Sequence, residues 1–203
     1  VERSRGLGDV YKRQDIRKKL TKQMENRGIN VFSETTIEKI EASDQLIASL
    51  SNGNKVLTDK VMGATGRVPN TEMLGLNEVG VKIGKQGNII VNKFNQTNIE
   101  SIYAIGDVTD RINLTPIAIA EGHAFSDREF GNINRFVSYD NVPSAVFSQP
   151  PVSVVGLTLE DTKILNIKAK EFVSEFNPLK NTISEKQEKT LIKLVVDEND
   201  KVL

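Results

Sequence analysis

The chain has 203 residues, no cysteine and a single histidine, and its 27 basic and 27 acidic residues balance. The lack of cysteine excludes a disulfide framework, a thiolate metal site and a redox dithiol within this sequence, and one histidine excludes a histidine-based metal cluster. The charge balance gives no electrostatic basis for binding nucleic acid or an anionic membrane. No apolar run approaches the roughly 20 residues of a membrane span, and no secretory signal is recognisable, so we expect a cytoplasmic protein.

The N-terminal part of the chain predicts one helix after an unassigned start. Residues 1–14 show no hydrophobic period and are interpreted as a disordered end or as sequence foreign to the rest. A helix is predicted over residues 15–27, because apolar residues recur at four-residue spacing between lysines and arginines. Gly28 suits the left-handed position that follows a helix end.

Short strands and turns are predicted next. The strands are expected at residues 30–33, 37–40, 45–50, 55–57 and 88–91. Asn52 and Gly53 form a strong hairpin turn signal within this series. The glycine-rich stretch 63–70 could let a backbone approach a ligand closely, although most such stretches are only turns.

The most informative stretch follows. Residues 102–105 are apolar and predict a buried strand that stops abruptly. Asp107 then lies beyond the carboxyl end of that strand, where open α/β sheets place their ligands. A helix is predicted over 115–130, with Thr115 as N-cap and Pro116 as the first helical residue. A carboxylate and a helix N-terminus at one crevice could hold a ligand with hydroxyls at one end and an electron-rich ring at the other.

The composition changes at residues 139–143, which predicts a boundary. Strands are expected afterwards at 145–147, 152–155, 168–172 and 191–196. Thr158 and Asp161 have the spacing of a capping box for a short helix. The sequence stops just after a turn, where a new strand has begun, and an unpaired strand leaves a sheet edge open. We therefore expect the chain to be a fragment.

Four segments in order resemble the pyridine nucleotide–disulfide oxidoreductases, and within that family the glutathione reductase branch. They are ATGRVPNT (64–71), IYAIGDV (102–108), LTPIA (114–118), and VFSQPP with VGLT (146–151 and 155–158). Dihydrolipoamide dehydrogenases usually have Ala-His in place of Thr-Pro and Pro-Glu in place of Pro-Pro. Such an enzyme, a mercuric reductase-like enzyme, and a non-catalytic nucleotide-binding or interaction module remain the alternatives.

The resemblance implies an α/β fold, with parts of FAD- and NAD(P)-binding Rossmann-like domains followed by part of an α+β dimerisation domain. Residues 15–62 resemble the end of the NAD(P)-binding domain, 63–139 the returning part of the FAD-binding domain, and 140–203 the start of the dimerisation domain. The implied cofactors are FAD and NADPH, the implied substrate is glutathione disulfide, and the full-length protein is expected to be a homodimer.

The family's cysteine pair and its His-Pro general acid have no counterpart in this sequence. No catalytic residue is therefore expected here, and the chain alone is predicted to be inactive as a disulfide reductase.

The resemblance also assigns roles to single residues. Asp107 resembles the aspartate that binds the ribityl chain of FAD, and Thr115 the residue whose backbone N–H meets the flavin ring. Gly66, Asn113 and Ala145 resemble positions that contact NADPH. The simpler alternatives are a turn-forming aspartate, an ordinary helix start and ordinary turns.

One residue departs from the branch. His123 stands where several glutathione reductases have an arginine that binds a glutathione carboxylate, and a neutral imidazole is a poorer carboxylate partner than a guanidinium. A surface histidine on a helix is the simpler alternative. Tyr139 is interpreted as a core or turn residue.

Overall fold

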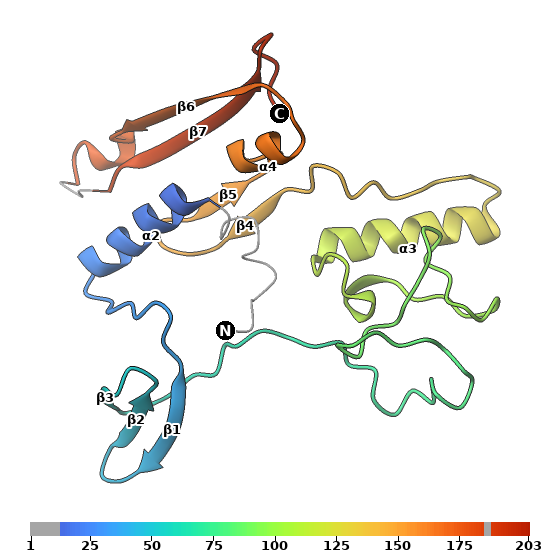
Figure 1. The fold of residues 1–203 in the computed structure, drawn as a ribbon, viewed down its shortest axis with the longest axis horizontal. Helices are drawn as coiled ribbons and strands as arrows, with labels where there is room; N and C mark the ends of the chain where they lie inside the picture. The colour runs from blue at the N-terminus through green and yellow to red at the C-terminus, as the bar shows by residue number, and fades with distance from the viewer. Residues whose placement is uncertain (1–12, 185–187) are drawn as a thin grey trace. The chain divides into compact units, whose positions relative to one another are not determined.

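The computed structural model describes residues 13–184 and 188–203, which fall into two compact units (Figure 1). Among the described residues, one unit comprises residues 13–65 and 143–203, and the other comprises residues 66–142. None of the helices formed by these residues is long and apolar enough to cross a membrane.

The first helix, α2 (Gln14–Asn26), has the glycine end that the sequence predicts. Gly28 has φ +83°. Its N–H donates to the carbonyl of Glu25 at 2.9 Å, and the N–H of Ile29 donates to that of Met24 at 3.2 Å. These two bonds satisfy carbonyls of the last turn that have no intrahelical partner. Most of the unassigned segment 1–14 lies outside the described residues, but Gln14 already belongs to α2.

A three-stranded antiparallel meander follows. Its strands, in spatial order, are β1 (Ile37–Ala42), β2 (Leu46–Leu50) and β3 (Lys55–Thr58). Gly53, with φ +84°, forms the predicted turn between β2 and β3. The strand predicted at residues 30–33 is wrong, because the meander begins at β1 and no described strand pairs with that segment.

The same unit continues after residue 143. The predicted hairpin strands are present as β4 (Ser144–Val146) and β5 (Val152–Val154), which pair antiparallel. Helix α4 (Leu159–Ile164) begins with the expected capping box, in which Thr158 Oγ1 accepts the Asp161 N–H at 3.0 Å and Asp161 Oδ2 accepts the Thr158 N–H at 3.0 Å.

A long antiparallel hairpin completes this unit. Its elements are β6 (Ala169–Phe176), the 3₁₀ turn η3 (Leu179–Asn181) and β7 (Thr190–Asp197). Helix α2 lies on one side of the hairpin (Figure 1), and Lys193 Nζ on β7 is 2.8 Å from a carboxylate oxygen of Asp15 on α2 and 2.6 Å from one of Glu171 on β6. Ion pairs therefore join a helix and a hairpin that are far apart in the sequence.

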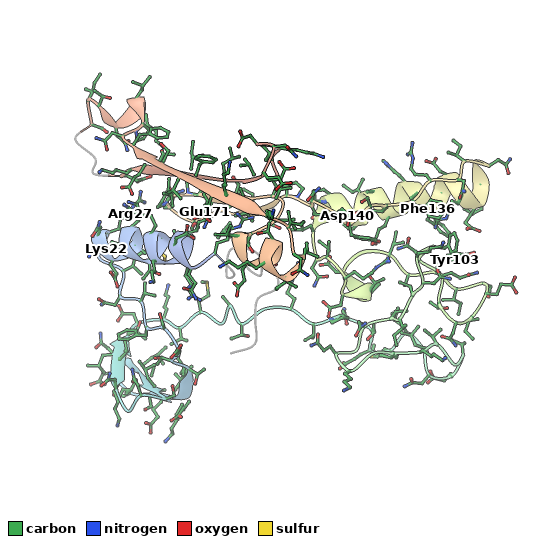
Figure 2. All side chains as sticks on the ribbon, turned by 45° about the horizontal axis from the view of Figure 1, so that its top comes forward. Lys22, Arg27, Tyr103, Phe136, Asp140 and Glu171 are labelled. Carbon is green, nitrogen blue, oxygen red and sulfur yellow. The ribbon has the colours of Figure 1, made fainter. Side chains whose placement is uncertain are left out.

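The second unit is built around helix α3 (Thr115–Phe130) and the 3₁₀ turn η2 (Gly106–Thr109). Its core consists of buried apolar residues with partly buried ones packed against them: Val81, Ile89 and Ala104, with Leu76, Val91, Ile99, Ile102 and Val108. Tyr103 and Phe136 lie beside α3 (Figure 2), and the ring centroid of Tyr103 is 4.9 Å from that of Phe125 on the helix.

Two strand predictions in this unit are wrong. Residues 88–91 and 102–105 contribute only isolated bridges, Ile83 with Ile89 and Gln96 with Tyr103. A strand buried in a parallel sheet pairs with a neighbouring strand on each side. Among the described residues, each of these two segments forms a bridge to only one residue. All ladders among the described residues are antiparallel and join segments close in sequence.

Candidate functional site

The turn at Gly106 and Asp107 is fixed by close packing against α3. Gly106 has φ +70°, and a Cβ at this position would lie 3.0 Å from the Cβ of Ala118. A side chain would thus be strained by the backbone and crowded by the helix. The glycine lets the turn lie directly on α3 and places Asp107 at the start of η2.

A buried carboxylate on α3 holds this turn. Glu121 is 1% exposed, and its Oε2 accepts the N–H of Gly106 at 2.6 Å. Its Oε1 accepts Arg111 Nη2 at 3.0 Å and the hydroxyl of Tyr139 at 2.5 Å. Burying a carboxylate is costly unless it is paired and hydrogen-bonded, and here three donors converge on it.

The phenol of Tyr139 is shaped by this environment. Burial raises the pKa of Tyr139 to about 12, and its hydrogen bond to Glu121 adds to the rise. The guanidinium of Arg111 also lies over the same ring, with Cζ 4.9 Å from the centroid. Tyr139 is therefore part of a polar network, a role that its interpretation as a core or turn residue did not include.

Asp107 itself is accessible. Its side chain is 48% exposed, and its Oδ2 forms an ion pair of 3.1 Å with Nη2 of Arg67, whose side chain is 73% exposed. Arg67 follows Gly66, which has φ +110°. A half-exposed carboxylate can accept hydrogen bonds from ligand hydroxyls.

The N-terminus of α3 is open to a ligand. The helix begins at Thr115 with Leu114 as N-cap, so the predicted cap position was wrong by one residue. Leu114 makes no side-chain hydrogen bond to the helix, and Thr115 is exposed. Pro116 lies in the first turn and has no N–H of its own. A helix start without a side-chain cap carries a partial positive charge that favours an electron-rich group.

The remaining predicted residues are more scattered. Asn113 lies just before α3 and donates to Asp110 Oδ1 at 2.9 Å, while its own Oδ1 is buried without a hydrogen-bond partner. His123 is exposed about two turns along α3. Ala145 is exposed on β4, which belongs to the other compact unit. The structure thus brings Asp107, Asn113 and the α3 start together in one segment of the second unit.

The chain belongs to the pyridine nucleotide-disulphide oxidoreductase family. Residues 1–122 match the family itself, and residues 142–203 match its dimerisation domain. The expected family membership and fold class are confirmed by these matches.

Curated relatives refine the comparison. The glutathione reductase of Nostoc sp. is 40% identical over 206 residues, covering 94% of this chain and 45% of the relative. That of Burkholderia cepacia is 39% identical, covering 93% and 42%. The trypanothione reductase of Trypanosoma congolense is 40% identical, covering 91% and 38%. The chain therefore spans less than half the length of these relatives.

Solved structures share the fold. The flavoprotein disulfide reductase RclA from Escherichia coli superposes with a TM-score of 0.80 at 23% identity, covering 90% of this chain and 42% of that one. LpdA from Mycobacterium tuberculosis superposes with a TM-score of 0.74 at 22% identity, covering 88% and 39%.

Sequence reasoning missed Glu121 and the partner of Asp107. A signal for Glu121 was available, because it shares one helix face with Ile117 and Ala124, and a charged residue on an apolar stripe is buried only when it is paired. Arg67 offered no such signal, since its pairing with Asp107 arises from two loops 40 positions apart.

Proposed function

We propose that this chain is part of an FAD-dependent NADPH:disulfide oxidoreductase that reduces glutathione disulfide and so maintains the cell's thiol balance. The observation that carries the proposal is the pairing of an accessible carboxylate, Asp107, with the uncapped start of α3 on one packed segment. The names of the curated relatives support the choice of substrate.

The described residues fit the ribityl and ring half of FAD. Asp107 would accept hydrogen bonds from ribityl hydroxyls, and the backbone N–H of Thr115 at the start of α3 would meet the electron-rich edge of the ring. Bound FAD would supply the hydride-accepting chemistry, which no side chain of this sequence provides. The positive end of α3 would favour electron density on the ring, so these residues bind and tune rather than react.

The nicotinamide and substrate assignments are further parts of the proposal. Gly66 would lie at the nicotinamide nucleotide, and Asn113 and Ala145 would contact NADPH through the main chain. His123, exposed on α3, would face the disulfide substrate.

We also propose the domain layout implied by the motifs, with residues 15–62, 63–139 and 140–203 in the NAD(P), FAD and dimerisation domains. The start of the dimerisation-domain match at residue 142 supports the last boundary.

An exposed apolar face of the β6–β7 hairpin, formed by Phe172, Phe176, Ile192 and Leu194, supports a homodimer of the full-length protein. The cytoplasm, where glutathione keeps thiols reduced, is the proposed location.

The flavin assignment is tested with FAD and riboflavin. Riboflavin carries the ring and the ribityl chain without the pyrophosphate and adenosine. We expect the purified chain to bind both with similar affinity, because the sequence holds no Gly-x-Gly-x-x-Gly motif for the pyrophosphate.

Asp107→Ala should lower the affinity for both FAD and riboflavin by about tenfold or more, since a charge-assisted hydrogen bond contributes about 1.5–3 kcal/mol. The matched control is Asp140→Ala, which removes an exposed carboxylate of the same unit (Figure 2). Equal flavin affinity for Asp107→Ala and the parent chain would refute the site.

The substrate assignment is tested in a chimera in which residues 15–203 replace the aligned part of the Nostoc sp. glutathione reductase. The chimera should retain FAD and prefer glutathione disulfide to trypanothione disulfide and lipoamide as the substrate. A flavin-loaded chimera that prefers another of these substrates would refute the assignment of glutathione disulfide as the substrate.

His123→Arg in this chimera should lower KM for glutathione disulfide with little change in kcat, because the contact is remote from the chemistry. Asn77→Arg, which adds the same charge elsewhere on the surface, should leave KM unchanged.

A further inference from the structure

The strongest unexplained feature of the molecule is the buried acid on α3. Glu121 lies on the face of the helix that also carries Ile117 and Ala124, and all three are buried. An apolar residue there would pack without a desolvation cost, and a buried ion pair is often no more stabilising than such packing. The carboxylate therefore suggests a purpose other than stability.

The three donors to Glu121 come from three separate segments. Gly106 is the first residue of η2, Arg111 belongs to the loop that leads into α3, and Tyr139 to the chain that follows the helix. The Glu121 side chain therefore links these three segments to helix α3. Both carboxylate oxygens are engaged, Oε2 by Gly106 and Oε1 by the other two.

The bond to Gly106 acts directly on the residue proposed to hold the flavin. The N–H of Gly106 belongs to the peptide between Ile105 and Gly106, so the 2.6 Å bond to Glu121 fixes the backbone one residue before Asp107. Glu121 and Thr115 also lie on the same helix. A rigid helix therefore sets the separation between the Asp107 turn and the N–H of Thr115 at the helix start.

We propose that Glu121 is a positioning residue, which fixes the Gly106–Asp107 turn relative to the N-terminus of α3 so that the two can engage one flavin. The proposal rests on the proposed function in its flavin part, while the geometric link stands on the hydrogen bonds alone. Glu121 would touch neither the flavin nor the substrate.

The test uses Glu121→Gln in the complete 203-residue chain. The amide has nearly the same shape, but it cannot accept all three donors, because its NH₂ group must face either Gly106 or the Arg111 and Tyr139 pair. The matched control is Glu129→Gln, an exposed position on the same helix whose carboxylate also accepts a tyrosine hydroxyl, that of Tyr103, at 3.2 Å.

Three readouts separate positioning from general stability. Hydrogen exchange of the Gly106 amide, followed by NMR, should become at least about tenfold faster in Glu121→Gln than in the control. The dissociation constants of FAD and riboflavin should rise about tenfold. In an alkaline absorbance titration, the Tyr139 phenol should titrate at lower pH than in the parent, because its pKa of about 12 depends partly on Glu121.

Variants of the two side-chain donors test the proposal independently, in case Glu121→Gln does not fold. Tyr139→Phe removes one donor and leaves the Gly106 bond in place, so it should raise the flavin dissociation constant less than Glu121→Gln does. Arg111→Lys, which keeps the charge, should preserve the Gly106 exchange rate, whereas Arg111→Ala should raise it.

The outcomes are distinct. A parent chain that binds neither flavin refutes the proposed function. Binding by the parent with unchanged affinity in Glu121→Gln overturns the positioning role, and so does an unchanged exchange rate at Gly106.

Discussion

Two ion pairs of nearly equal length in the second unit differ in their surroundings. Arg67 and Asp107 are 3.1 Å apart with both side chains exposed, whereas Arg111 and Glu121 are 3.0 Å apart with the carboxylate 1% exposed. Water screens the first pair and stabilises each charge after the other is removed. The buried carboxylate of the second pair has no such compensation.

This contrast predicts different costs for removing the two arginines. Arg67→Ala should change the free energy of unfolding by less than about 1 kcal/mol. Arg111→Ala should lower it by about 3 kcal/mol, because the buried carboxylate of Glu121 would lose one of its three hydrogen-bond donors. Urea unfolding of the two variants measures both values, and equal losses would contradict the assignment of burial as the cause.

The raised pKa of Tyr139 predicts that the stability of the folded chain depends on pH in the alkaline range. Its pKa in the folded chain is about 12, above the ordinary value of 10.0. The folded state therefore holds this proton more tightly, and the contribution to stability is complete below pH 10 and lost as the pH rises through 12. Denaturant titrations between these pH values should show a fall that is smaller in Tyr139→Phe.

At the scale of single elements, helix α4 has only six residues and depends on its cap. Thr158 and Asp161 satisfy each other's backbone N–H groups, which have no intrahelical partner at the start of any helix. The same sequence spacing predicted this helix, since capping needs only residues three apart.

Loss of this cap should be measurable. Thr158→Ala should lower the free energy of unfolding by about 1 kcal/mol. Thr182→Ala, at an exposed threonine of the same unit, should change it by less than half as much. A loss in Thr182→Ala as large as that in Thr158→Ala would show that the cap is not the cause.

The helix α2 and the β6–β7 hairpin show a different kind of element contact. Lys193 is largely buried between Asp15 and Glu171. Glu171 is labelled on the hairpin in Figure 2. Burial by itself lowers the pKa of Lys193, but the hydrogen bonds to the two carboxylates reverse this and raise it. Lys193→Met should therefore leave two carboxylates without their cation and destabilise this unit more than Lys168→Met, which removes an exposed lysine.

At the scale of the whole molecule, the sequence lacks the reacting groups of its proposed chemistry. It contains no cysteine, so electrons accepted from NADPH have no dithiol to reach within this chain. The purified chain should show no NADPH-dependent reduction of glutathione disulfide even when saturated with FAD. Turnover above that of free FAD would contradict this expectation, and the chimera described above is the positive control.

The exposed apolar face of the hairpin also belongs to this scale. Phe172 lies opposite Leu194 across the two strands, and both are exposed. Self-association of the chain in sedimentation experiments should weaken in Phe172→Glu and persist in Lys168→Glu. Equal association in both variants would exclude this face as the contact.

Signals carried by neighbours in the chain were sufficient for much of the structure. The glycine end of α2, the Asn52-Gly53 turn, the Thr158 cap and the hairpin strands depend on residues within a few positions, and the sequence predicted all of them. The helix predicted from residue 115 is also present, although its cap lies one residue before the expected position.

Only the tertiary structure decided what lies around the candidate site. The strands expected at 88–91 and 102–105 failed because a strand exists only with partners, which sequence periodicity does not specify. The pairing of Arg67 with Asp107, and of Glu121 with Gly106, Arg111 and Tyr139, depends on how distant loops pack against α3. The sequence by itself determined the family and the short-range elements, because both reside in contiguous motifs, while the buried network required three segments to meet in space.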